Sequence, residues 1–219
     1  MTRAIVILAL DETTTAADAG ALASALATLP EAVRGIGQSS AGVHLPGVVG
    51  PVGHGAGSMT WDLTVSTDLD VVLSDPAVIT ALESRATVAS AVTLAPIASA
   101  RVETPAPFVK RTLLLRVRND VAPDALHRFE SDLAEMPEHI GAIRSWSLAR
   151  TVGTAGWTPI RWTHAWEQEF ASLDGLSGEY MFHPFHWTTV DAWFDPEMPD
   201  HIVEPELAHL FYASDVPVL

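Results

Sequence analysis

The stretch RTLLLRV, residues 111–117, decides the fold, because a run of the same kind, RAIVILAL, opens the chain at residues 3–10. Both runs are short and contain consecutive apolar residues, which is typical of a buried strand. A helical stretch follows each run, and the two stretches share a segment: Leu26-Ala-Thr-Leu-Pro30 matches Leu133-Ala-Glu-Met-Pro137. The chain therefore contains an internal repeat, which has to be considered before any other feature.

The similarity between the two halves extends to their ends. In each half we predict a second strand, a third strand that carries a tryptophan and an acidic residue, a helical region and a closing strand. The matching segments are Ile36–Val43 and Ala142–Thr151, Trp61-Asp62 and Trp166-Glu167, Pro96–Val102 and Glu206–Ala213. Each half thus has the β-α-β-β-α-β order of a ferredoxin-like fold.

The predicted fold class is α+β, with two ferredoxin-like halves that form an intramolecular dimeric α+β barrel. A four-stranded sheet with helices on one face leaves its other face bare, and two such sheets can cover each other. We place the halves at residues 1–105 and 106–219, joined by the proline-containing linker ETPAP at residues 103–107. One chain then forms its own pseudo-dimer, and a further homodimer remains open.

The composition excludes several classes of protein. The 219 residues include no cysteine, which rules out disulfide scaffolds and cysteine-ligated metal sites. The formal net charge of −15 argues against nucleic acid and anionic membranes as partners. The apolar start MTRAIVILAL runs directly into the acidic segment DETTT, so we interpret it as a strand and not as a signal peptide. We expect a cytoplasmic protein whose partner is a small-molecule substrate.

The two halves differ in their aromatic content. Trp61 is the only Phe, Trp or Tyr before residue 108. The first half instead contains the glycine-rich segment GVHLPGVVGPVGHGAG, residues 42–57, which lacks the lysine of a phosphate-binding loop. We interpret it as a long hairpin connection in which His44 and His54 are solvated. The first half is therefore predicted to be a degenerate scaffold, and the second half to carry the active site.

One candidate histidine lies on the strand RWTHAWEQEF, residues 161–170. Side chains alternate between the faces of a strand, so one face is predicted to carry Trp162, His164, Trp166, Gln168 and Phe170. His164 would then stand on an aromatic face. The alternative is a core histidine whose ring nitrogens are satisfied locally.

Further candidates lie in EYMFHPFHW, residues 179–187. The residue before a proline avoids the helical region, so a helix should end near His183 and a second should begin at Pro184. His186 then falls in a first helical turn, where the partial positive charge favours the neutral imidazole that can act as a base. Tyr180 lies one turn before His183. The alternative is an aromatic helix joint without chemistry.

A metal site is a further alternative. His183 and His186 could act as ligands together with His164 or Asp191, and histidine-bound haem is possible by analogy of fold. Because Pro184 interrupts the helix face that such a pair needs, we predict no metal and no cofactor.

Taken together, THAWEQEF followed by YMFHPFH resembles the stress-responsive α/β-barrel family, also called the Dabb or dimeric α+β barrel family, over residues 110–214. The Tyr-x-x-His-Pro-x-His pattern is similar to that of its olivetolic acid cyclase-like members. In those members the first and last positions are the catalytic tyrosine and histidine, and the Thr-His strand adds a pocket histidine. The resemblance implies Tyr180, His186 and His164 as the catalytic residues here. Their equivalents in the first half are Pro76, Leu82 and Met59, so a single active pocket per chain is expected.

The predicted function is cofactor-independent general acid–base catalysis of the cyclase, lyase, isomerase or dehydratase type, on a carbonyl compound with an apolar or aromatic body. His186 is the base, Tyr180 donates a hydrogen bond to an oxyanion, and His164 assists. The predicted substrate-binding residues are His183, Trp162, Trp166, Trp187 and Phe182. The alternative is a non-catalytic stress-responsive protein that binds an apolar small molecule.

Overall fold

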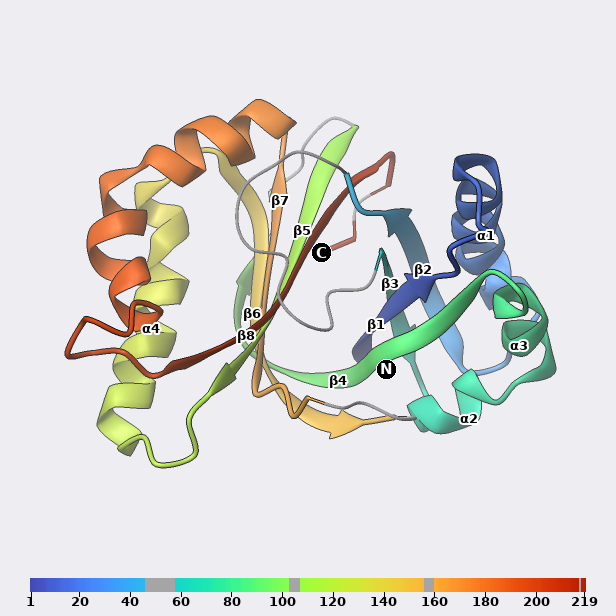
Figure 1. The fold of residues 1–219 in the computed structure, drawn as a ribbon, viewed down its shortest axis with the longest axis horizontal. Coiled ribbons are helices and arrows are strands. Elements are labelled where there is room, and N and C mark those ends of the chain that lie inside the picture. Colours follow the sequence, from blue (N-terminus) through green and yellow to red (C-terminus); the bar gives the residue numbers. More distant parts are fainter. Residues whose placement is uncertain (46–57, 103–106, 156–159, 217) are drawn as a thin grey trace.

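A computed structural model describes residues 1–45, 58–102, 107–155, 160–216 and 218–219 (Figure 1). Its eight strands form one antiparallel sheet in the order β2-β3-β1-β4-β6-β7-β5-β8. The strands of the first half are β1 (Thr2–Leu10), β2 (Ile36–Val43), β3 (Met59–Val65) and β4 (Ala86–Ala100). Those of the second half are β5 (Phe108–Val117), β6 (Ile143–Thr154), β7 (His164–Phe170) and β8 (Val203–Ser214).

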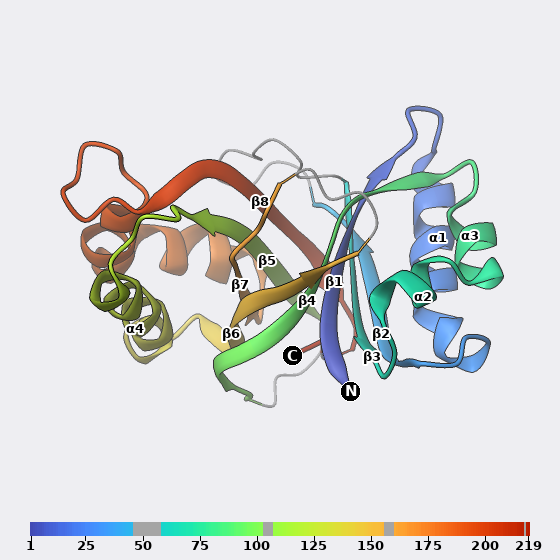
Figure 2. The same ribbon diagram turned by 90° about the horizontal axis from the view of Figure 1, so that it is seen from below.

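The strand order confirms the predicted fold class. Each half has the ferredoxin-like order, β2-β3-β1-β4 in the first and β6-β7-β5-β8 in the second. The helices lie on the two outer sides. Between them, the four strands of one half curve towards the four strands of the other (Figures 1 and 2). The first half contributes α1 (Ala16–Thr28), α2 (Leu69–Leu73) and α3 (Pro76–Leu82). The second half contributes α4 (Pro123–His139) and the helical turns between Gly175 and Trp193.

Local sequence signals set the starts of the long helices. Thr15 caps α1 in a reciprocal capping box, because its hydroxyl accepts from the Asp18 amide at 3.2 Å and the Asp18 carboxylate accepts from the Thr15 amide at 3.3 Å. Pro123 occupies the first turn of α4, where a backbone N–H would have no partner within the helix, so the missing N–H of proline costs nothing.

Three apolar cores follow from the alternation of side chains along the strands. Trp61 is buried between the first half's sheet and its helices, and Trp166 takes the equivalent place in the second half. A third core lies between the two sheets and includes Ile5, Val92 and Leu114. The repeat in the sequence thus gives two outer cores and one shared interior.

One long strand joins the halves edge to edge, which the sequence did not predict. β4 begins at Ala86, so the expectation of a closing strand at Pro96–Val102 was wrong about its start. Its first part pairs with β1 up to Leu94, and its later part pairs with β6 from Val92 to Ala100. The strand is longer than one sheet requires because it serves both. Pro96, which lacks an N–H, lies beside a register shift in the second ladder.

The opposite edges, β2 and β8, meet through fewer interactions. Leu45, just after β2, donates its amide to the Phe211 carbonyl at 2.9 Å. The ring of Tyr212 lies directly against Gly42, where an added Cβ would be 2.0 Å from the ring. Only glycine allows β2 and β8 to approach this closely.

The barrel interior contains a network of charged side chains from both halves. The Lys110 ammonium donates to Asp62 at 2.8 Å and to Glu167 at 2.7 Å. The Arg3 guanidinium donates twice to Glu167, at 2.6 and 2.9 Å, and the Tyr212 hydroxyl donates to Asp62 at 2.9 Å. All four charges are buried or partly buried, and the two cations balance the two anions.

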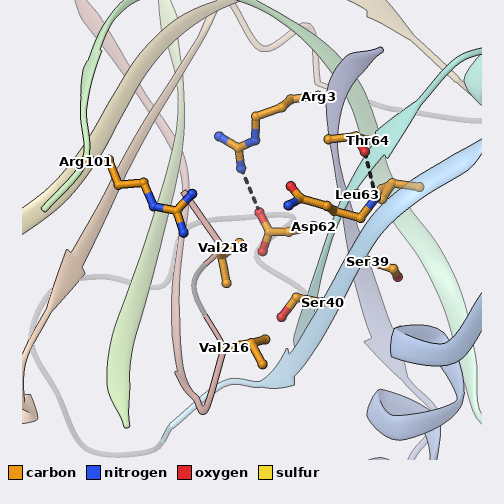
Figure 3. A pocket seen from close by; sticks show the side chains of 10 residues that line it. Arg3, Ser39, Ser40, Asp62, Leu63, Thr64, Arg101, Val216 and Val218 are labelled. Atoms are coloured by element: carbon orange, nitrogen blue, oxygen red, sulfur yellow. Dashed lines mark hydrogen bonds and ion pairs between the residues drawn. The ribbon is translucent and has the colours of Figure 1, made fainter. Parts of the chain in front are cut away.

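A cavity of about 370 Å³ opens beside this network (Figure 3). Arg3 and Asp62 face it from the barrel, Arg101 reaches it from the segment after β4, and Val216 and Val218 close it from the C-terminal segment.

Two predicted features lie wholly or partly outside the described residues. They are the glycine-rich connection, of which residues 46–57 with His54 are not described, and residues 103–106 of the linker. No helix among the described residues is long and apolar enough to cross a membrane.

Candidate active site

The segment after β7 folds as the proline signal predicts. A π-helical turn, Gly175–Tyr180, leads to a break at His183, and the chain becomes helical again at Pro184. A second π-helical turn, His186–Val190, follows directly. Tyr180 ends the first π-helical turn and His186 begins the second, so the break brings both side chains to the joint. Such turns are frequent at functional sites.

Tyr180 and His186 contact each other beneath these turns. Their ring centroids are 4.7 Å apart at an interplanar angle of 69°, an edge-to-face arrangement. Tyr180 is 1% exposed and His186 is 8% exposed. Burial raises the pKa of the Tyr180 hydroxyl, although the positive charge of Arg111 opposes this. The tyrosine is therefore a phenol that can donate a hydrogen bond.

Arg111 of β5 lies beside this pair and is a functional candidate that the sequence analysis missed. Its guanidinium carbon is 5.2 Å from the Tyr180 ring centroid. Its Nε donates to His209 Nε2 at 2.6 Å and its Nη1 donates to Gln168 Oε1 at 2.5 Å. Burial lowers the pKa of Arg111, but a guanidinium remains charged at neutral pH.

The two side chains that accept hydrogen bonds from Arg111, those of His209 and Gln168, carry no negative charge. Burial and the neighbouring guanidinium hold the pKa of His209 well below its ordinary value, which leaves its ring free to accept. Within the described residues no carboxylate lies within 4.0 Å of the Arg111 guanidinium, and Glu103 is the only acid among the other residues. A buried cation without a counter-ion is costly, so Arg111 is suited to an anionic ligand or intermediate.

Two buried polar atoms in the same cluster lack a hydrogen-bond partner among the described residues, Nε1 of Trp166 and Nδ1 of His186. The Asp191 carboxylate lies 3.5 Å from His186 Nδ1, which is within ion-pair range, but it makes no hydrogen bond to that atom. Buried polar groups are rarely left unpaired. A ligand that accepts from Trp166 and exchanges a proton with His186 would satisfy both.

His164 has a different set of partners. It lies on the same face of the sheet as Trp166, as predicted, but its Nε2 is 3.0 Å from Glu130 Oε1 and its Nδ1 is 2.8 Å from Thr163 Oγ1. Along β7 it is four residues from Gln168, about 13 Å in an extended strand. Burial lowers the pKa of His164, although Glu130 opposes the shift. The structure brings Tyr180 and His186 together but gives His164 no contact with either.

The predicted substrate-binding residues divide into three groups. Trp166 lies within the cluster. Trp162 was wrongly placed on the His164 face: β7 begins only at His164, and Trp162 packs inside the barrel, where its Nε1 donates to Ser90 at 3.0 Å. Phe182 and Trp187 are 72% and 58% exposed, so they do not line the Tyr180–His186 cluster.

The break in the helix explains the positions of Phe182, His183 and Trp187. His183 is half-buried, and its Nδ1 accepts from the Phe185 amide at 3.2 Å, so the ring caps the second helical segment. Phe182 and Trp187 flank the break on its outer side, with ring centroids 6.4 Å apart. Across the described residues, no three His, Cys, Asp or Glu side chains are grouped so that they could hold a metal ion.

A strand register was needed to find the missed residues. Gln168 was placed on the correct face, but Arg111 and His209 only become its neighbours when β5 pairs with β7 and β8, with Arg111 opposite Gln168 and Phe211. The available signal was the pair of cations Lys110 and Arg111 on a buried strand, because an interior strand position rarely carries a charge without a purpose.

Comparisons with solved structures support the fold of the whole chain. A proposed monooxygenase from Fusobacterium nucleatum is similar at a TM-score of 0.64 and 6% identity, covering 100% of this chain and 95% of that one. An anthrone oxidase-like protein gives a TM-score of 0.61 and 11% identity with the same coverage. A proposed monooxygenase from Lactobacillus acidophilus gives 0.55 and 12%, covering 100% and 98%. At these identities the likeness concerns the fold alone.

No curated protein matches the sequence. The second half does match a family, the Stress responsive A/B Barrel Domain or Dabb family, over residues 109–204. This range runs from β5 into β8 and contains Arg111, His164, Tyr180 and His186. The second half of this chain is therefore similar to the Dabb domain of stress-responsive A/B barrel proteins.

Proposed function

We propose that the protein is a cofactor-independent enzyme that moves a proton next to a carbonyl group, with His186 as the base and Tyr180 as the hydrogen-bond donor. The observation that carries the proposal is the buried contact of these two rings beside the uncompensated cation of Arg111. The three side chains supply the parts that such a reaction needs: a proton acceptor, an oxyanion partner and a positive charge.

The proposed reaction begins when His186 removes a proton from the carbon next to a substrate carbonyl. The bonding electrons move to the carbonyl oxygen and give an enolate. The Tyr180 hydroxyl donates to this oxygen, and Arg111 stabilises its charge. Asp191, 3.5 Å from His186 Nδ1, stabilises the imidazolium. Return of the proton to another atom of the substrate gives isomerisation, and loss of a leaving group from the neighbouring carbon gives elimination.

The surroundings of the cluster favour a substrate with an apolar or aromatic body. Phe170 packs edge-on against Tyr180 with centroids 5.4 Å apart, and Trp166 belongs to the same apolar core. Apolar walls with a few convergent polar groups are typical of small-molecule sites. Such walls also exclude water, which strengthens the interaction of Arg111 with an enolate.

The direct test is hydrogen–deuterium exchange at the α-carbon. The protein is incubated in D₂O with a panel of aryl ketones, β-keto acids and cyclic enones, and exchange is followed by proton NMR. We expect catalysed exchange for at least one compound, and a loss of about 10²-fold or more in His186→Ala. Phe182→Ala, at an exposed position beside the same break, is the matched control and should exchange like the wild type.

The binding-protein alternative makes the opposite prediction. In that case compounds of the panel bind, but neither the wild type nor any variant accelerates exchange. A second arm measures oxygen consumption with a hydroxyaromatic substrate, because proteins of similar fold are described as monooxygenases or as anthrone oxidase-like. Oxygen consumption without α-proton exchange would contradict the proposed reaction.

A further inference from the structure

A second cavity, of about 550 Å³, lies at the end of the barrel where β5 and β6 end and β7 begins. Four arginines are among its lining residues: Arg116, Arg118, Arg150 and Arg161. Of the residues that the structure describes, neither Tyr180, His186 nor Arg111 lines it, and no Asp or Glu does. His164, which the structure separates from Tyr180, lies in its wall.

This concentration of positive charge is unusual for this chain. The whole protein has 12 lysine and arginine residues against 27 acids, a net charge of −15, yet four of the 12 line one cavity. Guanidinium groups repel one another, so clustering them costs free energy. In a protein with more acids than bases, most arginines would be expected to lie beside carboxylates. A concave surface of one sign raises the local concentration of ligands of the opposite sign.

Carboxylates within the protein compensate only part of this positive charge. Glu130 binds Arg150 through two hydrogen bonds, at 2.6 and 2.8 Å, so that guanidinium is compensated. Arg118 is only 3.7 Å from the exposed Asp120, an ion pair of little strength. Across the described residues no carboxylate lies within 4.0 Å of Arg116 or Arg161. Arg116 and Arg161 therefore have no counter-ion among the described residues, and Arg118 is weakly held.

The base of the cavity is held in place by backbone and side-chain hydrogen bonds. Thr163 receives the Val117 amide on its hydroxyl at 2.8 Å and donates its own amide to the Leu115 carbonyl at 2.9 Å. Its carbonyl accepts from the Thr151 amide at 2.9 Å. One residue thereby ties β5, β6 and the start of β7 together, and the arginines project from fixed backbone positions.

Glu130 binds both His164 and Arg150 at the wall of the cavity. Its carboxylate is shared by Arg150 and by His164 Nε2, so both of its partners are fixed in position. Burial would raise the pKa of Glu130, but these two hydrogen bonds lower it below its ordinary value. The carboxylate is therefore ionised, and its negative charge is shared by Arg150 and His164.

We propose that this cavity, formed around Arg116, Arg118 and Arg161, binds a phosphate-bearing small molecule. Several guanidinium groups match a dianionic phosphate, whose oxygens accept paired hydrogen bonds from the planar fork of each arginine. A monocarboxylate would need only one of them. The volume is that of a small-molecule site, and the apolar side chains of Leu126 and Val121 in the wall provide for an apolar portion of the ligand.

The experiment titrates the full-length protein with phenyl phosphate, inorganic pyrophosphate and benzoate by isothermal calorimetry, at low and high salt. We expect saturable one-to-one binding of phenyl phosphate that weakens with salt, and no measurable binding of benzoate. Pyrophosphate distinguishes a site for phosphate alone from one that also requires the apolar body, and either result supports the proposal provided that binding saturates.

Variants locate the binding. Arg116→Gln and Arg161→Gln should each weaken phenyl phosphate binding about tenfold or more, since each removes a charge-assisted hydrogen bond. Arg34→Gln, at an exposed arginine in the first half, removes the same charge far from the cavity and should leave the affinity unchanged. Binding by His186→Ala should equal that of the wild type, which separates this site from the proposed active site. Absence of saturable binding, or equal loss in Arg34→Gln, would overturn the proposal.

Discussion

Asp62 and Glu167 accept hydrogen bonds from the same ammonium group, that of Lys110, at 2.8 and 2.7 Å. The two acids follow Trp61 and Trp166 at equivalent places in the two halves of the repeat. Each tryptophan points to an outer core, so the next residue on each strand points into the barrel. The repeat thus brings one acid from each half to the same buried cation.

Lys110→Met should destabilise the protein by about 3–5 kcal/mol, because it leaves two buried carboxylates with only Arg3 between them. The measurement is the free energy of unfolding from urea denaturation. The double variant Lys110→Met/Glu167→Gln leaves the single pair Arg3–Asp62 and should recover part of the loss. A single variant as stable as the wild type would show that the network is not needed for the fold.

The pH dependence of stability isolates Glu167. Burial would raise its pKa, but Arg3 and Lys110 lower it to about 2. Because the folded pKa lies below the unfolded one, this contribution is present above about pH 4.5 and is lost as the pH falls towards 2. Asp62 shifts in the opposite direction, since burial raises its pKa. The wild-type curve minus that of Glu167→Gln should therefore fall over this window, and a flat difference would contradict the assignment.

Tyr180→Phe should lower kcat by about 10²-fold while KM changes little, because it removes only the hydroxyl that donates to the oxyanion. The phenyl ring should still pack against His186 and Phe170, so the free energy of unfolding should change by about 1 kcal/mol or less. Steady-state kinetics on the compound that exchanges its α-proton gives both constants. A rise in KM at unchanged kcat would make Tyr180 a binding residue only.

Arg111→Met should abolish most of the turnover without unfolding the protein. The substitution removes a buried cation that has no carboxylate partner among the described residues, and this gain offsets the loss of its hydrogen bonds to His209 and Gln168. Arg111→Lys keeps the charge but not the fork, and should retain an intermediate rate. If Arg111→Met instead unfolds the protein at room temperature, the guanidinium is structural.

The two seams of the barrel should differ in hydrogen exchange. The β4–β6 seam is a ladder from Val92 opposite Thr154 to Ala100 opposite Trp146. At the other seam the Leu45 amide donates to the Phe211 carbonyl, and side-chain bonds of His44 and Ser40 add to it without forming a ladder. Amides of the β4–β6 ladder should exchange slowly, and the Leu45 amide much faster. Exchange followed by NMR, residue by residue, measures both. Equal protection of the two seams would contradict this difference.

The repeat carried most of the fold, because periodic apolar runs and turn signals are local properties of the sequence. The start of β4 was missed because nothing local distinguishes a strand that serves one sheet from a strand that serves two. Ala86–Ala100 becomes a single strand only when β1 and β6 are both present as partners.

In the candidate site, too, the features set by local sequence were predictable and those set by strand pairing were not. Pro184 predicted the break between the helical turns, and Tyr180 and His186 lie at the two turn ends that face this break. The position of Trp162 was wrong because side chains alternate between faces only within a strand, and β7 begins two residues after Trp162. Arg111 and His209 required the pairing of β5 with β8, which no single segment encodes.

The shared strand β4 makes the two halves one thermodynamic unit. If the first half unfolds, β6 loses its neighbour and the apolar interior around Leu114 meets water; if the second half unfolds, the last residues of β4 are left as an unpaired edge. Neither half is then a module that evolution could recombine freely with another partner. Because both halves lie in one chain, they cannot exchange partners as the subunits of a dimer of separate chains can, and each half can change in sequence without changing the other.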